Sequence, residues 1–478
     1  MDMAWMLVVI SPVVVLVLIR LIKAVRGGRR DQQCYLLNYK CFKAPDDRRV
    51  DVDTCAKIIL RNKNLGMEEF RFLLRAIVSS GIGEHTFAPK IVIDGHEEFP
   101  RLDEAVAEMD EIIFTTLDQL FESYASISPK DIDILVVNVS SIATTPSLTA
   151  RVINRYKMRD DVKIFNLTGM GCSASLVAID LVQHLFNCYK NKLAVVVSTE
   201  SMGPFWYCGK DRSMMLTNCL FRIGGCSMLL TNNHALRDKA KMRLRCSVRI
   251  HTGADDEAYN CCSWDKDEMG YDGFRLTKSL PRSGVKALIE NFKLLLPKML
   301  PLKELLRYIA VTYIRKEINP KLVKGMKTKP DIKTGVDHFC IHPGGKAVID
   351  EMGKNFELSE YDVEPARMTL HRFGNTSSSA IWYVLGYMEA KKRLKKGNKI
   401  LMIGLGSGFK CNTCVWEVTK DLTDRNVWDE CIDIYPRKVD VSPFAEKFGW
   451  ITDQCIDLLS EKDVDDLRDR YARELGAY

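Results

Sequence analysis

The sequence predicts an α/β protein built from two similar halves. Short apolar stretches rich in Val, Ile and Leu alternate with longer segments of helical periodicity. The same alternation occurs twice, once on each side of an apolar and basic insertion at 283–335. Alternating strands and helices are typical of α/β proteins with largely parallel strands. Self-similarity between the halves is weak, so the duplication depends on the pattern of elements.

The first half begins with a mixed region, 31–100, that contains one helical pattern at 67–78. Apolar spacing of three and four residues predicts a helix at 104–124, and a continuous apolar run predicts a buried strand at 132–138. The remaining predicted elements are a helix at 146–156, a strand at 162–166, a helix after residue 172, and strands at 193–198, 224–230 and 242–250.

The second half repeats this order. A strand at 336–342 ends in Pro-Gly-Gly, with a helix beyond it, and a strand is predicted at 399–404. His371–Asn375 is predicted to be a turn that leads into a helix at 377–391.

The insertion at 283–335 allows two interpretations. Its apolar runs carry basic residues, and Pro297 and Pro301 should interrupt any helix long enough to span a membrane. It could be a helical pair that packs on the core, followed by a basic loop at 315–334. It could also be a surface that rests on a bilayer, with Lys and Arg toward anionic headgroups.

The N-terminus predicts a membrane anchor. Residues 3–19 carry no charge, and five basic residues follow at Arg20, Lys23, Arg26, Arg29 and Arg30. The length is at the short end for a membrane-spanning helix. The basic flank indicates that the bulk of the chain lies in the cytosol. A cleaved signal peptide would carry its basic residues on the other side.

The composition is that of a folded globular protein, with 46% hydrophobic and 27% charged residues in 478. The sixteen scattered cysteines indicate reduced thiols rather than a disulfide framework. Cys411 and Cys414 form a lone C-x-x-C pair without the two further ligands that zinc requires. The net charge of +7 is too weak to indicate a nucleic-acid partner.

Cys172 is the most informative residue. It lies in Gly-Met-Gly-Cys-Ser-Ala-Ser, between a predicted strand and a predicted helix. This order places the thiol at a helix N-terminus, where the helix dipole favours a thiolate. A thiolate on such a turn is suited to covalent catalysis. Alternatively, Cys172 is a small core residue, since free cysteine is often buried.

His342 and Asn375 also lie at predicted element ends. His342 closes the strand before Pro-Gly-Gly, at a strand terminus where α/β sites form. Asn375 precedes a helix and offers two uncharged donors, although it could simply be a helix cap.

Cysteine, histidine and asparagine together are the set used in decarboxylative Claisen condensation. The cysteine carries an acyl thioester, and the other two donate hydrogen bonds to the enolate that forms as CO2 leaves. A papain-like protease uses the same residue types, but this chain lacks the sequence that surrounds the protease cysteine.

The sequence resembles the plant 3-ketoacyl-CoA synthases, the condensing enzymes of very-long-chain fatty-acid elongation, over about 31–440. The motifs that carry this resemblance are Asn-Leu-Thr-Gly-Met-Gly-Cys-Ser-Ala-Ser at 166–175, His-Phe-Cys-Ile-His-Pro-Gly-Gly at 338–345, His-Arg-Phe-Gly-Asn-Thr-Ser-Ser-Ser at 371–379, Gly-Ser-Gly-Phe-Lys-Cys-Asn at 406–412 and Ser-Ser-Gly-Ile-Gly-Glu at 79–84. The resemblance implies a thiolase-like fold, in which two αβ halves form a layered αβαβα core. We expect this core to follow the predicted N-terminal transmembrane helix. Family members usually have two hydrophobic N-terminal spans, whereas this chain shows one short segment.

Carried over by matching motifs, Cys172 is the acylated nucleophile and His342 and Asn375 are the enolate-stabilising pair. Supporting roles are implied for His251, His338 and His371, and a glycine-rich active-site loop for Gly404, Gly406 and Gly408. The expected regions are an anchor at 1–30, a connecting region at 31–100, a nucleophile-bearing half at 101–240, a His- and Asn-bearing half at 241–440 and a tail at 441–478.

The resemblance implies an acyltransferase that extends a long acyl-CoA by two carbons with malonyl-CoA. It implies no metal or redox cofactor and no nucleic-acid partner. A homodimer in the endoplasmic reticulum membrane is expected, working with a ketoacyl-CoA reductase, a hydroxyacyl-CoA dehydratase and an enoyl-CoA reductase. Two alternatives remain open: a non-catalytic regulatory subunit of an elongase, and a type III polyketide synthase-like enzyme.

Overall fold

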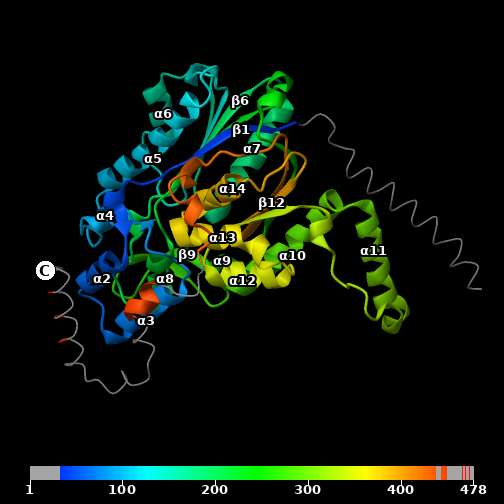
Figure 1. Cartoon of the computed structure of the whole chain (residues 1–478). Helices are drawn as coiled ribbons and strands as arrows, with labels where there is room; N and C mark the ends of the chain where they lie inside the picture. The colour runs from blue at the N-terminus through cyan, green and yellow to red at the C-terminus, as the bar shows by residue number, and fades with distance from the viewer. Residues whose placement is uncertain (1–32, 438–442, 449–465, 467–468, 470–472, 474–478) are drawn as a thin grey trace, which may run out of the picture.

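A nine-stranded mixed sheet forms the centre of the molecule (Figure 1). The computed structural model describes residues 33–437, 443–448, 466, 469 and 473. The sheet strands are β1 (Tyr35–Cys41), β4 (Ile134–Asn138), β5 (Lys163–Leu167), β6 (Leu193–Thr199), β7 (Gly225–Thr231), β8 (Met242–His251), β11 (His338–Ile341), β12 (Lys399–Gly406) and β13 (Lys410–Val418). Their order is β11-β12-β13-β8-β1-β7-β6-β4-β5.

The strand directions confirm the two similar halves. Outward from the antiparallel β1–β8 pair, one half continues as β7, β6 and β4, and the other as β13, β12 and β11. In both halves the first two pairings are antiparallel and the third is parallel. In the first half, β5 adds one more parallel strand.

The prediction of largely parallel strands is wrong. β12 and β13 are joined by a turn too short for a crossover, so they form an antiparallel hairpin. β7 likewise returns antiparallel to β6. Two small two-stranded sheets lie outside the main one, β2 (Arg49–Val50) with β3 (Thr86–Phe87), and β9 (Cys262–Lys266) with β10 (Asp272–Leu276).

Helices cover both faces of the sheet (Figure 1). They are α2 (Val52–Arg61), α3 (Met67–Ser79), α4 (Lys90–Ile93), α5 (Leu102–Glu122), α6 (Leu148–Tyr156), α7 (Ala174–Cys188), α8 (Arg212–Leu220), α9 (Asp256–Asn260), α10 (Leu280–Met299), α11 (Leu302–Tyr313), α12 (Lys346–Asn355), α13 (Glu360–Phe373), α14 (Ala380–Ala390) and α15 (Pro443–Phe448).

The layers follow from which side chains each strand buries. In β4, Leu135 and Val137 belong to the apolar cluster that includes α5, whereas Ile134 and Val136 belong to the cluster that includes α7. Helix α7 packs on β4 and β6 of one half and on β13 of the other. Helix α7 therefore lies between strands of the two halves, which is the layered arrangement that the thiolase-like fold implies.

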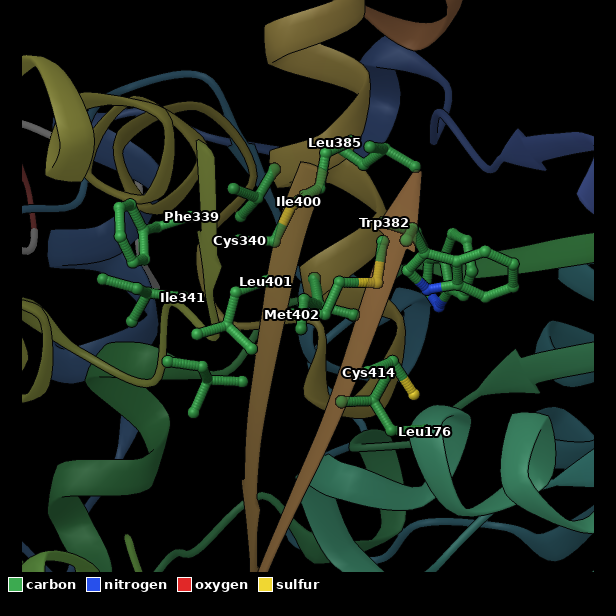
Figure 2. Close-up of a cluster of buried hydrophobic side chains, with 14 of the residues drawn as sticks. Leu176, Phe339, Cys340, Ile341, Trp382, Leu385, Ile400, Leu401, Met402 and Cys414 are labelled. Atoms are coloured by element: carbon green, nitrogen blue, oxygen red, sulfur yellow. The ribbon is translucent and has the colours of Figure 1, made fainter. Parts of the chain in front are cut away.

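Helix α14 is the second central helix. All its side chains are buried, and Trp382 and Leu385 pack with β11 and β12 in one cluster (Figure 2). Figure 2 also shows Leu176 of α7 beside Cys414 of β13. Each of α7 and α14 is preceded by a turn that carries a predicted site residue. The packing of the two helices therefore fixes where these two turns meet.

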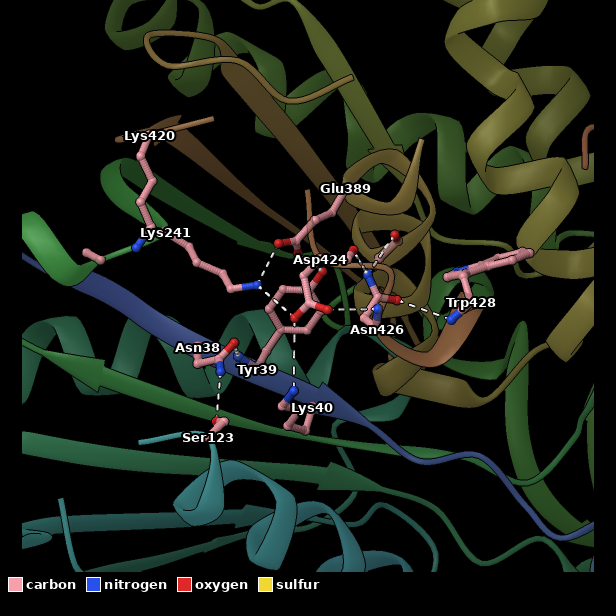
Figure 3. A network of polar contacts seen from close by, with 12 residues as sticks. Asn38, Tyr39, Lys40, Ser123, Lys241, Glu389, Lys420, Asp424, Asn426 and Trp428 are labelled. Atoms are coloured by element: carbon pink, nitrogen blue, oxygen red, sulfur yellow. Dashed lines mark hydrogen bonds and ion pairs between the residues drawn. The ribbon is translucent and has the colours of Figure 1, made fainter. Parts of the chain in front are cut away.

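A buried polar cluster also joins the halves (Figure 3). Lys241, at the start of β8, donates to Glu389 of α14 at 2.5 Å, and the Tyr39 hydroxyl of β1 donates to the same carboxylate at 2.6 Å. Glu389 is 1% exposed. Asp424 lies 3.5 Å from Lys241 and completes the cluster.

The elements that sequence analysis did not predict include the sheet strands β1 and β13 and helix α13. β1 carries Asn38 and Lys40, and β13 carries Asn412 and Thr413, so neither has the continuous apolar pattern of a buried strand. Asn38 is buried all the same, because Ser123 accepts its amide hydrogen bond at 2.8 Å. Helix α13 contains Pro365 and many polar residues, which hide its periodicity.

Two local predictions need correction. His371–Phe373 form the last turn of α13, so the predicted turn begins only at Gly374. The predicted loop at 315–334 includes a π-helical turn (Ile314–Ile318) and two 3-10 turns (Pro320–Val323 and Ile332–Thr334). By contrast, the prolines interrupt the helices as predicted, since α10 ends two residues after Pro297 and Pro301 caps the start of α11.

The predicted N-terminal anchor lies outside the described residues, as does most of the tail at 441–478. In the described part of the chain, every helix is too short or too polar to cross a bilayer. All the cysteines described in the structure are free thiols.

Candidate active site

Cys172 lies in a tight turn directly before α7, as predicted. The turn is the 3-10 segment Gly171–Ser173, and α7 begins at the next residue. Gly169 and Gly171 have positive φ angles of 66° and 62°, a conformation that favours glycine. A Cβ at Gly171 would also lie 2.7 Å from the backbone nitrogen of Ser407, so this position has no room for a side chain.

The end of β4 holds the nucleophile turn in place. The Ser140 carbonyl accepts from Gly169 N at 3.2 Å, and its hydroxyl accepts from Gly171 N at 2.9 Å. Buried Glu200, just after β6, accepts from the backbone nitrogens of Ser140 and Ser141 at 3.0 and 2.9 Å. The nucleophile is therefore positioned by the ends of two parallel strands.

Burial raises the pKa of the Cys172 thiol to about 11, while a hydrogen bond from Ser377 acts in the opposite direction. The Ser377 hydroxyl lies 3.7 Å from Cys172 Sγ. The resting residue is thus a thiol at neutral pH, rather than the thiolate that a helix N-terminus favours by itself. Its proton must leave as the sulfur attacks.

Asn375 is held beside the nucleophile by the turn between α13 and α14. Its Oδ1 accepts from Ser377 N at 2.9 Å. Its backbone nitrogen donates to Leu220 O at 2.9 Å, and its carbonyl accepts from Arg222 N at 3.0 Å. The amide nitrogen Nδ2 donates to Gly344 O over a long 3.5 Å contact, and it also hydrogen-bonds to Cys172.

A hydroxyl cluster brings this second-half turn to the first half. Ser378 donates to Asn138 Oδ1 of β4 at 2.9 Å and lies 2.6 Å from the Ser198 hydroxyl of β6. Ser175 of α7 donates to the Ser378 carbonyl at 2.7 Å. All four residues are fully buried, so the contact between the halves at the site is fixed by polar groups.

His342 approaches from the end of β11. It is 4% exposed, and burial lowers the pKa of its imidazole to about 4. Gly344 links His342 to Asn375, because Gly344 N donates to His342 O at 2.9 Å and Gly344 O faces the Asn375 amide. Within the described residues, His342 Nδ1 has no hydrogen-bond partner.

The predicted glycine-rich loop is mostly strand. Gly404 and Gly406 belong to β12, and only Gly408 lies in the turn, with φ of 97°. A Cβ at Gly406 would lie 2.4 Å from Ser173 Oγ and 2.7 Å from Met170 O. The glycines therefore let β12 run directly beside the nucleophile turn, which forms one wall of the site.

The three supporting histidines occupy different places. His338 begins β11, at the opposite end from His342, and its Nε2 lies 3.3 Å from Asn398 Oδ1, so the structure does not bring it to the nucleophile. His251 ends β8 opposite Lys410, beside the Gly408 turn, and accepts from Gly253 N at 3.1 Å. Buried His371 contacts Tyr435 Oη at 2.9 Å and packs against Gly83.

Sequence reasoning missed Ser377, Ser378 and Glu200. Ser377 and Ser378 lie in the run of serines after Asn375, and Glu200 follows the strand at 193–198. The position of Glu200 at the carboxyl end of a parallel strand is a signal that could have indicated its place near the site.

Comparison with known proteins agrees with this architecture. The family model described as FAE1/Type III polyketide synthase-like protein matches residues 27–318, and that of the C-terminal part of 3-oxoacyl-[acyl-carrier-protein] synthase III matches 332–418. Among solved structures, the type III polyketide synthase domain of Steely1 from Dictyostelium has a TM-score of 0.61 at 15% identity, covering 81% of this chain and 99% of its own. Tetrahydroxynaphthalene synthase from Streptomyces coelicolor has a TM-score of 0.62 at 16% identity, with the same coverage. The fold and the site thus define a condensing enzyme of the thiolase-like superfamily.

Closer relatives narrow this class. 3-ketoacyl-CoA synthase 19 of Arabidopsis thaliana is 56% identical over 437 residues, covering 91% of this chain and 94% of the relative. 3-ketoacyl-CoA synthase 12 of the same plant is 54% identical over 451 residues, with the same coverage. The chain belongs to the 3-ketoacyl-CoA synthase family.

Proposed function

We propose that this protein condenses a long or very-long-chain acyl-CoA with malonyl-CoA, giving a 3-ketoacyl-CoA two carbons longer, CO2 and CoA. The observation that carries the proposal is the placement of the Cys172 thiol, the Asn375 amide and the buried His342 imidazole around Gly344 and the turn before α7. Each residue comes from a different element, and each can act as a nucleophile or as an uncharged hydrogen-bond donor.

The first step is acyl transfer to the cysteine. Cys172 Sγ attacks the thioester carbonyl of the acyl-CoA, the C–S bond to CoA breaks, and the thiol proton passes to the departing CoA sulfur. Because burial keeps Cys172 protonated, the proton moves as the sulfur attacks, and neutral His342 is suited to relay it.

The second step is decarboxylation of malonyl-CoA and attack on the acyl-cysteine. The C–C bond to the carboxylate breaks, its electron pair forms an enolate, and negative charge collects on the thioester oxygen. Asn375 Nδ2 and an imidazole N–H of His342 donate to that oxygen. The enolate carbon then attacks the acyl carbonyl, the C–S bond to Cys172 breaks, and the released thiolate takes up a proton from solvent to return to the thiol.

Uncharged donors suit this step. With its pKa lowered to about 4, His342 is neutral near pH 7, so it neither pairs strongly with the malonyl carboxylate nor keeps it from leaving. We propose that the reaction needs no metal or redox cofactor, because every bond change above balances without one.

The activity is tested with full-length protein in detergent, labelled malonyl-CoA and a series of long acyl-CoAs. Wild type should form labelled 3-ketoacyl-CoA. Cys172→Ala should not, whereas Cys188→Ala should behave as wild type, because Cys188 is exposed at the far end of α7.

Three other outcomes would contradict this function or favour one of its alternatives. Equal products from wild type and Cys172→Ala would overturn the proposal. Absence of turnover together with co-purification of an active synthase would favour a regulatory subunit. Products carrying several malonyl-derived units would favour a polyketide synthase.

The cellular setting belongs to the same proposal. We expect an endoplasmic reticulum membrane protein, anchored by the apolar segment at 3–19 and its basic flank, with the catalytic part in the cytosol. A 3-ketoacyl-CoA must be reduced, dehydrated and reduced again to yield a saturated chain. We therefore expect a ketoacyl-CoA reductase, a hydroxyacyl-CoA dehydratase and an enoyl-CoA reductase as partners.

We also propose a homodimer joined through β5. This strand ends the sheet, and Ile164 on it is 43% exposed. An apolar edge strand leaves backbone donors and acceptors open for a second copy. Light scattering in detergent should give the mass of a dimer, and Ile164→Lys should shift it to that of a monomer. A monomeric wild type would contradict this.

A further inference from the structure

Helix α11 and the segment 314–333 that follows it extend away from the body of the molecule (Figure 1). We call these residues, 302–333, the α11 projection. On its inner side, Leu305, Val311 and Val323 are buried. Its outer side has no such packing, so the nature of the exposed side chains indicates what this side contacts.

The outer side exposes large apolar residues at regular intervals. Tyr313, Ile318, Leu322 and Met326 are all exposed, and Leu322 reaches 68%. Single exposed apolar residues are ordinary, but a cluster on one segment marks a contact surface. All four residues lie within the fourteen residues 313–326.

The same segment carries most of the excess positive charge. Residues 302–333 contain nine Lys or Arg and three acidic residues, a net charge of +6 in a chain whose total is +7. Arg315, Lys316, Lys321 and Lys324 are exposed and form no ion pair with any residue that the structure describes. These charges are available to an external anionic partner.

A groove between α10 and α11 adds an apolar recess to this surface. Its cavity measures about 910 Å³ and is walled by Phe292, Leu296 and Ile309, among other residues. Lys327, Lys329 and Lys333 line the same cavity, and each is paired with an acidic residue, Asp331, Glu357 and Asp362 respectively. The groove thus offers apolar walls to an acyl chain, and the charges open to anionic headgroups are those of the unpaired basic residues named above.

We infer that the α11 projection is a membrane-docking surface that rests on an anionic lipid bilayer. Tyr313, Ile318, Leu322 and Met326 enter the boundary between headgroups and acyl chains, and the unpaired basic residues contact the headgroups. This contact is separate from the N-terminal anchor and holds the catalytic part at a fixed orientation to the bilayer. It does not depend on the proposed condensation.

Photocrosslinking tests this inference with the full-length protein in lipid nanodiscs. A photoreactive phenylalanine analogue replaces Leu322 in one variant and Phe99 in a control variant. Phe99 is 81% exposed in the connection between α4 and α5, two helices that lie across the molecule from α11 (Figure 1). With phosphatidylserine in the bilayer, position 322 should give a lipid adduct and position 99 should not. The readout is the mass of the adduct and is independent of catalysis.

Charge removal supplies a second measurement. Lys321→Gln with Lys324→Gln should lower the lipid adduct at position 322 roughly 25-fold, since each of the two basic residues near an anionic surface strengthens binding about fivefold. Lys130→Gln with Lys190→Gln, two exposed lysines of the first half, should leave it unchanged.

Three results would overturn the inference: equal lipid adducts at 322 and 99, an adduct at 322 that does not depend on phosphatidylserine, and cross-linking at 322 to a second copy of the chain in place of lipid.

Discussion

At the scale of single residues, the site depends on groups that are buried yet uncharged. Asn375 Oδ1 accepts from Ser377 N, while its Nδ2 makes a long 3.5 Å hydrogen bond to Gly344 O and another to Cys172. His342 is kept neutral by burial, which lowers its pKa to about 4. Donors of this kind stabilise charge as it develops in the transition state and do not attract it beforehand.

Asn375→Asp should separate the two steps of the reaction. The aspartate keeps an acceptor for Ser377 N but replaces the amide donor with a negative charge next to the enolate. Malonyl-CoA decarboxylation should fall by about 10²-fold or more, the usual effect of losing one such donor. Acylation of Cys172, followed by the mass of the intact protein, should persist.

Asn191→Asp, at an exposed position, is the control for that experiment. Loss of acylation and decarboxylation to the same extent in Asn375→Asp would show that Asn375 acts on the fold of the site and not on the enolate.

His371 makes stability depend on acidity. Burial and then Arg437 lower its pKa from 6.5 to about 4, so as pH falls below 6.5 the unfolded chain takes up a proton that the folded protein refuses. Its contribution is complete above pH 6.5 and is lost by about pH 4. It amounts to about 3 kcal/mol. His371→Gln should therefore lose about 3 kcal/mol less stability than wild type over this range.

Urea unfolding at several pH values measures this difference. Burial also lowers the pKa of His342, so the variant keeps the pH dependence of stability that His342 contributes. His96→Gln, on the surface, serves as control. Identical pH profiles for wild type and His371→Gln would contradict the assignment.

At the scale of elements, the nucleophile turn and β12 fit together because glycine occupies the contact. A side chain at Gly406 would meet Ser173 Oγ and Met170 O, on both sides of Cys172. Catalysis is sensitive to such a displacement, since a shift of about 1 Å can cost about 10²-fold in rate.

Gly406→Ala should therefore reduce kcat/KM by about 10²-fold. It should cost only roughly 1–3 kcal/mol of stability. Gly284→Ala in α10 is the matched control, because a Cβ there finds only ordinary contacts, the nearest at 3.7 Å. Condensation assays and thermal unfolding of both variants measure the two effects. Equal activity of the two variants would show that β12 does not set the position of Cys172.

At the scale of the whole molecule, the two halves are held together by apolar packing around α7 and α14 and by the buried cluster of Lys241, Glu389 and Tyr39 (Figure 3). Removing one partner of a buried ion pair leaves an uncompensated charge, which typically costs 3–5 kcal/mol, whereas replacing both can cost far less.

Lys241→Met should destabilise the protein by about 3–5 kcal/mol, because Glu389 then keeps only the Tyr39 hydroxyl. The double variant Lys241→Met with Glu389→Met should lose clearly less than the sum of the two single variants. Urea unfolding of the four proteins gives the coupling energy. Strict additivity would mean that the cluster does not act as a unit.

The sequence by itself determined the α/β class, the duplication and the element that carries each of Cys172, His342 and Asn375. The apolar patterns of β4, β6 and α7 can be recognised in the sequence because the side chains of these elements are buried, whichever neighbouring element covers them. The turn before α7 was also predictable, since Gly169 and Gly171 mark a backbone that other residues avoid. Local patterns record local requirements.

Only the tertiary structure decided how these elements meet. β1 and β13 are central although Asn38 and Thr413 interrupt their apolar pattern, because partners distant in the chain, Ser123 for Asn38 and Asn291 for Thr413, satisfy polar groups that look exposed in the sequence. Asn375 is brought to Cys172 by hydrogen bonds of Ser378 with Asn138 and Ser198, which lie 180 residues or more away in the chain. His338 and His342, alike in the sequence, lie at opposite ends of β11, and burial sets the protonation of His342. Burial and long-range hydrogen bonds are properties of the folded chain, and no local pattern encodes them.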